Sequence, residues 1–448
     1  MRCAATLGIS LAWGLLSGPA AAGPADEPAS ARPNIVLILA DDLGWGELGC
    51  YRESAGIPTP NIDALAAAGV RFTDAYVTCP VCAPTRAGIL TGRYQQRFGF
   101  ELTPGQAERT SPDYGLPRDQ VTLAERLRAA GYETAMVGKW HLGFASGYLP
   151  LERGFSEFFG FLGGSHTYRI VNTNTEQILR GSTVLKEVEY LTDAFAKESV
   201  AFIERQRSRP FFLYLPFNAV HSPMEVTPDR MKRFDDIEQE RRKKFAAMLT
   251  ALDEAVGQVR KALEDAGATQ NTLVFFLSDN GGPTRETSSQ NGPLRGTKSQ
   301  VWEGGVRVPF LLSWPAGEIP AGAACSQPVV SLDIAATVLA AAGVAVAPTS
   351  PPLDGVNLLP LVRGGCTTVA HEAIFWRFGD QWAVRKGDWK LLLARENGKV
   401  IDAPRLFNLH DDIAEARDLA AQMPEKIVEL KSDWDTWNAQ NIAPRWPK

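Results

Sequence analysis

The sequence predicts an α/β protein with a large, mostly parallel sheet sandwiched by helices, followed by a small C-terminal antiparallel sheet with one helix. Three features carry this prediction. Unbroken apolar runs such as Asn34–Ala40 are typical of strands buried on both faces of a parallel sheet. Segments with helical periodicity alternate with these runs. Beyond residue 350 the pattern changes to short, closely spaced strands.

The large sheet and its helices are expected within residues 34–350. Its strands are predicted where apolar runs lie between turn residues, at 34–40, 71–77, 132–137, 211–215, 272–277 and 308–314. Helices are predicted at 61–68, 122–130, 238–266 and 334–342. The longest helix has the clearest pattern, because its apolar residues recur every three or four positions from Phe245 to Leu263 and Gly267 ends it.

A second unit is expected at residues 351–448, after the proline-rich segment Pro348–Pro352. Short strands are predicted at 373–376, 382–385 and 389–393, and a helix at 425–437. This order of elements predicts a small α+β subdomain.

Composition and the N-terminal segment limit the class of protein. The 448 residues carry a formal charge of −5, which argues against a nucleic-acid partner, and six cysteines are too few for a disulfide scaffold. Residues 1–22 are typical of a secretory signal peptide, and residues 23–33 of a flexible leader. The apolar run of the signal is shorter than the ~20 residues that span a bilayer, so no stable membrane insertion is expected. We therefore expect a periplasmic or secreted protein, bacterial rather than lysosomal because the sequence lacks an Asn-x-Ser/Thr sequon.

Two of the predicted strands end in acidic or amide side chains. One runs into Asp41 and Asp42, and the other into Asp279 and Asn280. The carboxyl ends of parallel strands meet at one edge of a sheet, where ligands bind. Clustered carboxylates are costly to bury without a cation, and oxygen donors suit Ca²⁺ or Mg²⁺ rather than zinc. The alternative is that Asp42 caps a helix and Asp279–Gly282 forms a tight turn.

The segment Cys82–Arg93 contains Cys-x-Pro-x-Arg followed by Leu-Thr-Gly-Arg. It resembles the signature of the type I sulfatases, in which the cysteine is converted to formylglycine. The resemblance extends over nearly the whole mature chain, through segments at 34–42, 138–143, around 221, 279–282, 296–309, 354–360 and 386–390. It implies an alkaline-phosphatase-like fold whose C-terminal subdomain completes the active-site cleft.

The resemblance also implies the chemistry: a sulfuric ester hydrolase acting on a sulfated carbohydrate, with a Ca²⁺ ion in preference to Mg²⁺. A formylglycine-generating enzyme would be the partner during maturation. The hydrated aldehyde offers two oxygens, of which one attacks sulfur and the other later expels sulfate as the aldehyde re-forms. A thiolate or a serine lacks this exit route. A divalent cation favours the ionised nucleophile at neutral pH.

Individual site residues follow from the same resemblance. The implied metal ligands are Asp41, Asp42, Cys82, Asp279 and Asn280. The implied catalytic residues are Cys82, Arg86, Lys139, His141, His221 and Lys298, and the implied substrate-binding pair is Ser165 and His166.

Each of the polar catalytic residues has an implied role. Arg86 would steady the diol and the metal site. Lys139 would neutralise the sulfate and the nucleophile, and His141 would accept the diol proton. His221 and Lys298 would contact the sulfate and help the leaving oxygen depart. These side chains supply the positive charge that an anionic ester needs.

Several alternatives remain open at this stage. Cys79 and Cys82 form a Cys-x-x-Cys pair, which is also typical of a redox dithiol, a disulfide or half of a zinc site. A phosphonate or phosphate-ester hydrolase of the same superfamily is the alternative reaction. The alternative to an enzyme is a non-catalytic glycan-binding protein in which Cys82 stays unmodified. Trp302, Trp376 and Trp382 could stack on sugars, although packing is the expected role.

Overall fold

The computed structural model describes Met1 and residues 32–446, apart from 53–55, 106–108, 110, 170–176 and 187. The predicted signal peptide beyond Met1, and the predicted leader up to residue 31, lie outside the described residues. Among the residues that are described, no helix is both long enough and apolar enough to cross a membrane.

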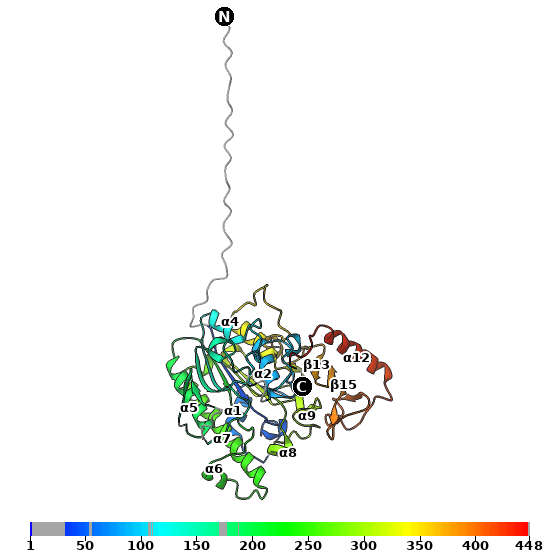
Figure 1. Cartoon of the computed structure of the whole chain (residues 1–448), viewed down its shortest axis with the longest axis horizontal. Helices are drawn as coiled ribbons and strands as arrows, with labels where there is room; N and C mark the ends of the chain where they lie inside the picture. The colour runs from blue at the N-terminus through cyan, green and yellow to red at the C-terminus, as the bar shows by residue number, and fades with distance from the viewer. Residues whose placement is uncertain are drawn as a thin grey trace.

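A ten-stranded sheet forms the centre of the molecule (Figure 1). Its strand order is β11-β2-β10-β9-β1-β8-β4-β5-β6-β7. The central strands are all parallel and comprise β9 (Thr272–Ser278), β1 (Asn34–Ala40), β8 (Phe211–Pro216), β4 (Glu133–Lys139) and β5 (Glu157–Phe161). Both ends of the sheet contain antiparallel pairs, made at one end by β10 (Phe310–Ser313) with β9 and β2 (Val70–Phe72), and at the other by β6 (Leu179–Arg180) with β5 and β7 (Thr183–Val184). The edge strand β11 (Ala323–Cys325) pairs with β2 in parallel. The predicted, mostly parallel sheet is therefore confirmed.

Helices cover both faces of this sheet, because alternate side chains of each buried strand point to opposite faces. Val36 and Ile38 of β1 pack in one apolar cluster, and Ile35 and Leu37 pack in another. The helices of the first cluster are α1 (Pro60–Ala67), α5 (Leu191–Arg205) and α7 (Glu240–Asp265). Those of the second are α2 (Cys82–Thr91), α4 (Leu123–Ala129), α10 (Asp333–Ala341) and α11 (Leu359–Arg363). The predicted sandwich is present.

Shorter elements connect these parts. The remaining short α-helices are α6 (Pro228–Lys232), α8 (Thr284–Thr287) and α9 (Glu303–Val306). Single 3₁₀ turns lie at Trp45–Glu47, Gln95–Arg97, Pro150–Glu152, Thr269–Asn271 and Pro315–Gly317.

The prediction of one strand at 71–77 is wrong. The chain leaves the large sheet after β2 and forms β3 (Ala75–Tyr76), which pairs with β12 (Val329–Val330) in a separate two-stranded sheet. The break falls at Asp74, whose carboxylate forms ion pairs with Arg307 and Arg385. These long-range contacts pull the backbone away from the line of β2.

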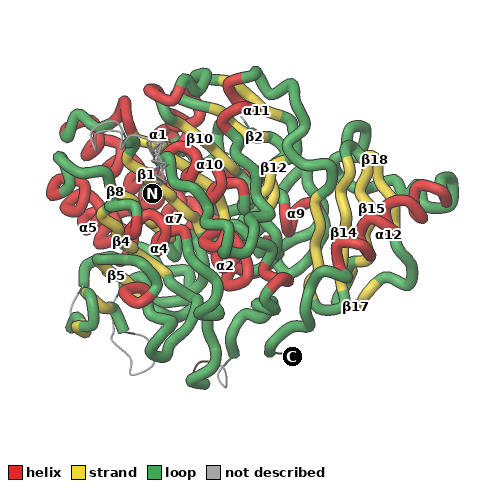
Figure 2. The backbone as a smooth tube through the Cα atoms, turned by 90° about the horizontal axis from the view of Figure 1, so that it is seen from above, coloured by secondary structure: helices red, strands yellow, loops and turns green. Residues whose placement is uncertain are grey.

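The C-terminal part forms a second, antiparallel sheet, which lies to the right of the large sheet in Figure 2. Its strands are β13 (Ile374–Phe378), β14 (Gln381–Lys386), β15 (Trp389–Leu393) and β18 (Arg405–Asn408). A hairpin of β16 (Arg395–Glu396) and β17 (Lys399–Val400) follows β15, and α12 (Pro424–Asn438) packs beside β14 and β15. The predicted small sheet with one helix is confirmed, and β18 is an additional strand.

Candidate active site

The carboxyl ends of the five central strands bring the predicted site residues together at one edge of the sheet. Ala40 of β1 pairs with Ser278 of β9. Asp41 and Asp279, the residues that follow these two strands, therefore lie side by side. Lys139 is the last residue of β4. The loop after β8 carries His221, and its Ala219 carbonyl accepts a hydrogen bond from the Asp41 amide at 2.9 Å.

Carboxylate and amide oxygens form the floor of the site. Asp41, Asp42, Asp279 and Asn280 are all fully buried. One ligand atom each from Asp41, Asp279 and Cys82 lies within 4.8 Å of the others. Asp41 Oδ1 and Asn280 Oδ1 are buried without a hydrogen-bond partner. Unpartnered oxygens of this kind fit a hard divalent cation, because each supplies a free lone pair.

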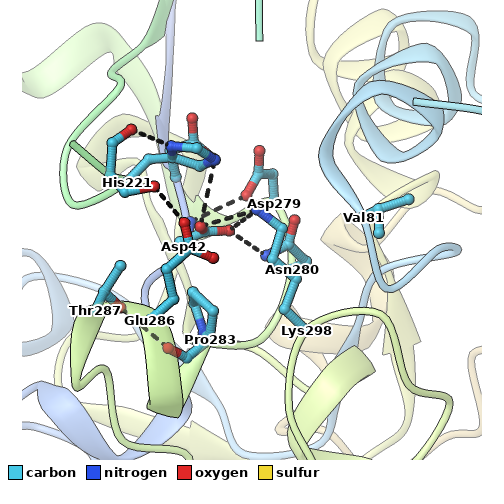
Figure 3. A network of polar contacts seen from close by, with 12 residues as sticks. Asp42, Val81, His221, Asp279, Asn280, Pro283, Glu286, Thr287 and Lys298 are labelled. Carbon is cyan, nitrogen blue, oxygen red and sulfur yellow. Dashed lines mark hydrogen bonds and ion pairs between the residues drawn. The ribbon is translucent and has the colours of Figure 1, made fainter. Parts of the chain in front are cut away.

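Cationic side chains surround these carboxylates. Arg86 Nη2 lies 2.7 Å from Asp279 Oδ2, and Lys139 Nζ lies 2.5 Å from Asp41 Oδ2. Lys298 Nζ lies 2.7 Å from Asp42 Oδ1, and Figure 3 shows Lys298, Asn280 and His221 grouped around Asp42. The positive charge is thus concentrated at the sheet edge.

This charge arrangement shifts the pKa of the acidic groups in different directions. Burial acts to raise the pKa of Asp41, but Lys139, His221 and Arg86 together hold it below its ordinary value. Burial and the neighbouring charge of Asp41 raise the pKa of Asp279. Two carboxylates this close repel one another, which a shared cation relieves.

Two site residues adopt a backbone conformation that is rare outside glycine. Asp42 has φ 65° and His141 has φ 63°. The His141 amide donates to the Leu162 carbonyl at 3.0 Å, and the Asp42 amide donates to Asp279 Oδ1 at 3.3 Å. Such strain persists where the surroundings hold the residue, and it is concentrated at functional sites.

Cys82 is the first residue of α2 and is 3% exposed. Pro84 occupies the first turn of the helix, where a backbone N–H is not needed, and Gly92 ends the helix with φ 67°. Thr85 Oγ1 donates to the Cys79 carbonyl at 2.8 Å and so holds the turn before the helix. Burial raises the pKa of the Cys82 thiol. Cys79 and Cys82 are not joined to each other.

The disulfide among the described residues links Cys325 of β11 to Cys366, which follows α11.

A pocket of about 380 Å³ opens in front of Cys82. Four predicted site residues line it together with Cys82, namely His141, Ser165, His221 and Lys298. His221 Nε2 lies 3.6 Å from Asp42 Oδ2, and His221 Nδ1 donates to the Ser222 carbonyl at 2.6 Å. Burial, with the charges of Lys139 and Arg86, lowers the pKa of His141 well below its ordinary value. His141 is therefore a neutral imidazole near pH 7.

The other predicted residues lie behind the pocket wall. Arg86 and Lys139 are fully buried and reach the site through Asp41 and Asp279. His166 is not among the lining residues; its ring packs against Phe161 with centroids 5.3 Å apart.

The sequence prediction missed some lining residues of the same pocket. Arg109, Thr103 and Phe378 belong to its wall. They come from loops and from β13 and belong to none of the motifs, so no local pattern marked them. The three tryptophans serve packing, as predicted: Trp302 and Trp376 are at most 1% exposed, and Trp382 packs on Trp434 with centroids 5.0 Å apart.

Comparison with known proteins agrees with this geometry. The family model "Sulfatase" matches residues 33–344. The chain is 37% identical to N-acetylgalactosamine-6-sulfatase of Canis lupus familiaris over 84% of this chain and 75% of the relative. It is also 37% identical to human arylsulfatase A, over 85% of this chain and 77% of the relative.

Among solved structures, the chain is similar to Ps i-CgsB in complex with k-i-k-neocarrahexaose, with a TM-score of 0.86, 34% identity and coverage of 93% of this chain and 94% of that one. The chain belongs to the sulfatase family and is a sulfuric ester hydrolase.

Proposed function

We propose that this sulfatase hydrolyses sulfate esters on a sulfated carbohydrate, with a formylglycine made from Cys82 and a bound Ca²⁺ ion. The observation that carries the proposal is that the Cys82 thiol lines the pocket and lies within 4.8 Å of carboxylate oxygens of Asp41 and Asp279. The carbohydrate preference is supported by relatives named N-acetylgalactosamine-6-sulfatase and by a similar structure that binds a neocarrahexaose.

The ion would be held by Asp41, Asp42, Asp279, Asn280 and the modified Cys82. Oxygen donors with two unpartnered buried atoms suit Ca²⁺, which accepts six to eight oxygen ligands. A bound divalent cation favours the ionised form of a nearby oxygen nucleophile. The formylglycine hydrate supplies the attacking oxygen and, through its second oxygen, a route for sulfate release.

The side chains around this centre have complementary roles. Arg86 holds Asp279 and Asp41 in place through its buried guanidinium. An ammonium has three N–H donors, so Lys298, which lines the pocket, retains donors for sulfate oxygens while paired with Asp42. Lys139 is buried behind the wall and paired with Asp41, so it would act on the nucleophile and the sulfate through its charge. The neutral imidazole of His141 is suited to accept a proton from the hydrate. His221, which also lines the pocket, is suited to assist the leaving oxygen.

Ser165, which lines the pocket, completes the proposal as a substrate-facing residue, whereas the expected substrate contact of His166 is replaced by packing against Phe161. The protein would be exported through residues 1–22 to the periplasm or the medium, and would be a substrate of a formylglycine-generating enzyme.

Mass spectrometry of the peptide that contains Cys82 tests the proposal. Protein co-expressed with a formylglycine-generating enzyme should carry an aldehyde at position 82 and should release sulfate from p-nitrophenyl sulfate or k-i-k-neocarrahexaose. Cys82→Ala should abolish sulfate release, because it removes the attacking oxygen. An unmodified thiol in protein that releases sulfate would contradict the mechanism.

The matched control is Cys79→Ser, which changes the other cysteine of the pair. It should keep the aldehyde and the activity, whereas a redox dithiol would need both cysteines. Comparing the hydrolysis rates of p-nitrophenyl phosphate and p-nitrophenyl sulfate distinguishes the proposed sulfatase from the alternative phosphate-ester hydrolase. A phosphatase would release phosphate faster than sulfate.

A further inference from the structure

A larger cleft of about 680 Å³ adjoins the catalytic pocket. It is lined by residues 283–286, 295–300, Trp302 and 395–398, and we name it the basic cleft. Lys298 and Ser299 line both the basic cleft and the catalytic pocket. A ligand whose sulfate lies beside Lys298 can therefore continue into the basic cleft.

The walls of the basic cleft come from two parts of the chain that are distant in the sequence. One wall is α8 and the segment before α9, at the edge of the large sheet. The opposite wall is the β16–β17 hairpin, a separate two-stranded sheet that follows β15, and α9 lies between the large sheet and the four-stranded C-terminal sheet in Figure 2. The site described above uses neither Arg285 nor this hairpin.

The cleft carries a surplus of arginine. Arg295 is paired with Glu396 at 2.5 Å and its guanidinium stacks on Trp302 at 3.9 Å. Arg395 is paired with Asp380 at 2.8 Å. Arg285 is exposed, and among the described residues its guanidinium has no hydrogen-bond or ion-pair partner.

Among the described residues, neither acidic side chain of the cleft forms an ion pair with Arg285. Glu396 pairs with Arg295 and with Arg405, at 2.5 and 3.2 Å. Glu286 Oε1 accepts a hydrogen bond from Ser222. A second guanidinium lies close to the Arg285 backbone, because Arg241 Nη1 donates to the Arg285 carbonyl at 2.6 Å. This end of the cleft therefore has two guanidiniums, of Arg285 and Arg241, against the one carboxylate of Glu286, although the whole chain has a formal charge of −5.

We infer that the basic cleft binds the continuation of an anionic oligosaccharide beyond the sulfate ester in the catalytic pocket, with Arg285 contacting a second acidic group on that chain. The inference rests on the proposed function and extends it to polymeric, multiply charged substrates. A guanidinium suits this role because its planar fork binds sulfate and carboxylate groups through paired hydrogen bonds.

Binding to a protein that cannot turn over its ligand tests the inference. Cys82→Ala protein, kept in calcium buffer, is titrated calorimetrically with k-i-k-neocarrahexaose and with galactose 6-sulfate. We expect the hexaose to bind at least tenfold more tightly than the monosaccharide. Adding Arg285→Glu should weaken hexaose binding by about tenfold or more, and raising the salt concentration should reduce this difference.

The matched control is Arg207→Glu, an equal charge change on an exposed residue before β8, at the opposite edge of the parallel strands. It should leave hexaose binding unchanged. Equal weakening by both variants, or no binding of the hexaose by the Cys82→Ala protein, would overturn the inference.

The two proposals fail separately. Sulfate release without any effect of Arg285→Glu on hexaose binding removes only the role of the cleft. Hexaose binding that depends on Arg285, together with wild-type protein that releases sulfate while residue 82 keeps an unmodified thiol, removes only the proposed mechanism.

Discussion

At the scale of single residues, two glycines allow close packing around the site, because a side chain at either position would collide with its neighbours. A Cβ atom added to Gly164 would lie 2.5 Å from His141 Nε2. A Cβ atom on Gly281 would lie 1.8 Å from the Gly304 carbonyl oxygen, where α9 packs on the Asp279–Gly282 segment. The positions of His141 and of the proposed metal ligands therefore depend on glycine at these contacts.

Gly164→Ala should displace the His141 ring, since the added methyl group occupies part of its space. We expect kcat for sulfate release to fall by about 100-fold, the order of loss that a displacement of about 1 Å produces. Gly364→Ala, at the exposed end of α11, is the matched control and should keep the activity. Thermal melting should show that both variants remain folded. An unchanged kcat in Gly164→Ala would contradict the role of His141.

At the scale of elements, one buried ion pair ties α10 to the chain that enters the C-terminal sheet. His371 Nε2 lies 2.8 Å from Asp333 Oδ1, and Asp333 also accepts hydrogen bonds from the Val330 and Val356 amides. Burial disfavours a charged imidazole, but the charge of Asp333 outweighs it and raises the pKa of His371. His371 thus has a structural role.

This ion pair makes stability depend on pH in a defined direction. A histidine whose pKa is raised by folding stabilises the protein fully below its unfolded pKa of about 6.5, and loses this contribution as pH rises through the folded value. The difference in melting temperature between wild type and His371→Gln should therefore be larger at pH 5.5 than at pH 9. His410→Gln, an exposed histidine, is the control. A difference that grows with pH would contradict the pairing.

At the scale of the whole molecule, a buried ionic cluster joins the two sheets. Lys390 Nζ of β15 lies 2.7 Å from Glu303 Oε1 of α9 and 3.0 Å from Glu415 Oε1. Burial would raise the pKa of Glu303, but the positive charges of Lys390 and Arg307 lower this pKa to about 2. For Glu415 burial prevails and raises the pKa to about 7. The Gly305 carbonyl of α9 accepts a hydrogen bond from the Gly281 amide at 3.0 Å. The C-terminal sheet thereby supports the loop that contains the proposed metal ligands.

Removing the proposed ion should destabilise the whole molecule, because Asp41 and Asp279 lie on separate strands that a shared cation holds together. Dialysis against EDTA should lower the melting temperature by several degrees, and Ca²⁺ should restore it more fully than Mg²⁺ at the same concentration. The measurement needs no substrate and applies equally to Cys82→Ala protein. A melting temperature that EDTA leaves unchanged would contradict a resident cation.

Much of the fold was predictable because its signals are local. The apolar runs predicted the parallel core, and the capping pair Thr122 and Glu125 marks the start of α4, where each side chain accepts a hydrogen bond from the other's amide. The break after β2 was not predictable, because it depends on Arg307 and Arg385, which are distant in the sequence from Asp74. β18 was missed because four residues are too short to show a period.

The sequence by itself determined the family resemblance and the candidate site residues, because the Cys82–Arg93 motif and the acidic strand ends are contiguous segments. Only the tertiary structure decided which residues line the catalytic pocket and the basic cleft together. It placed Arg109 beside Cys82, buried His166 against Phe161, and set Arg285 across a cleft from the β16–β17 hairpin. These neighbours come from loops whose positions depend on strand order and long-range ion pairs, which no short pattern encodes.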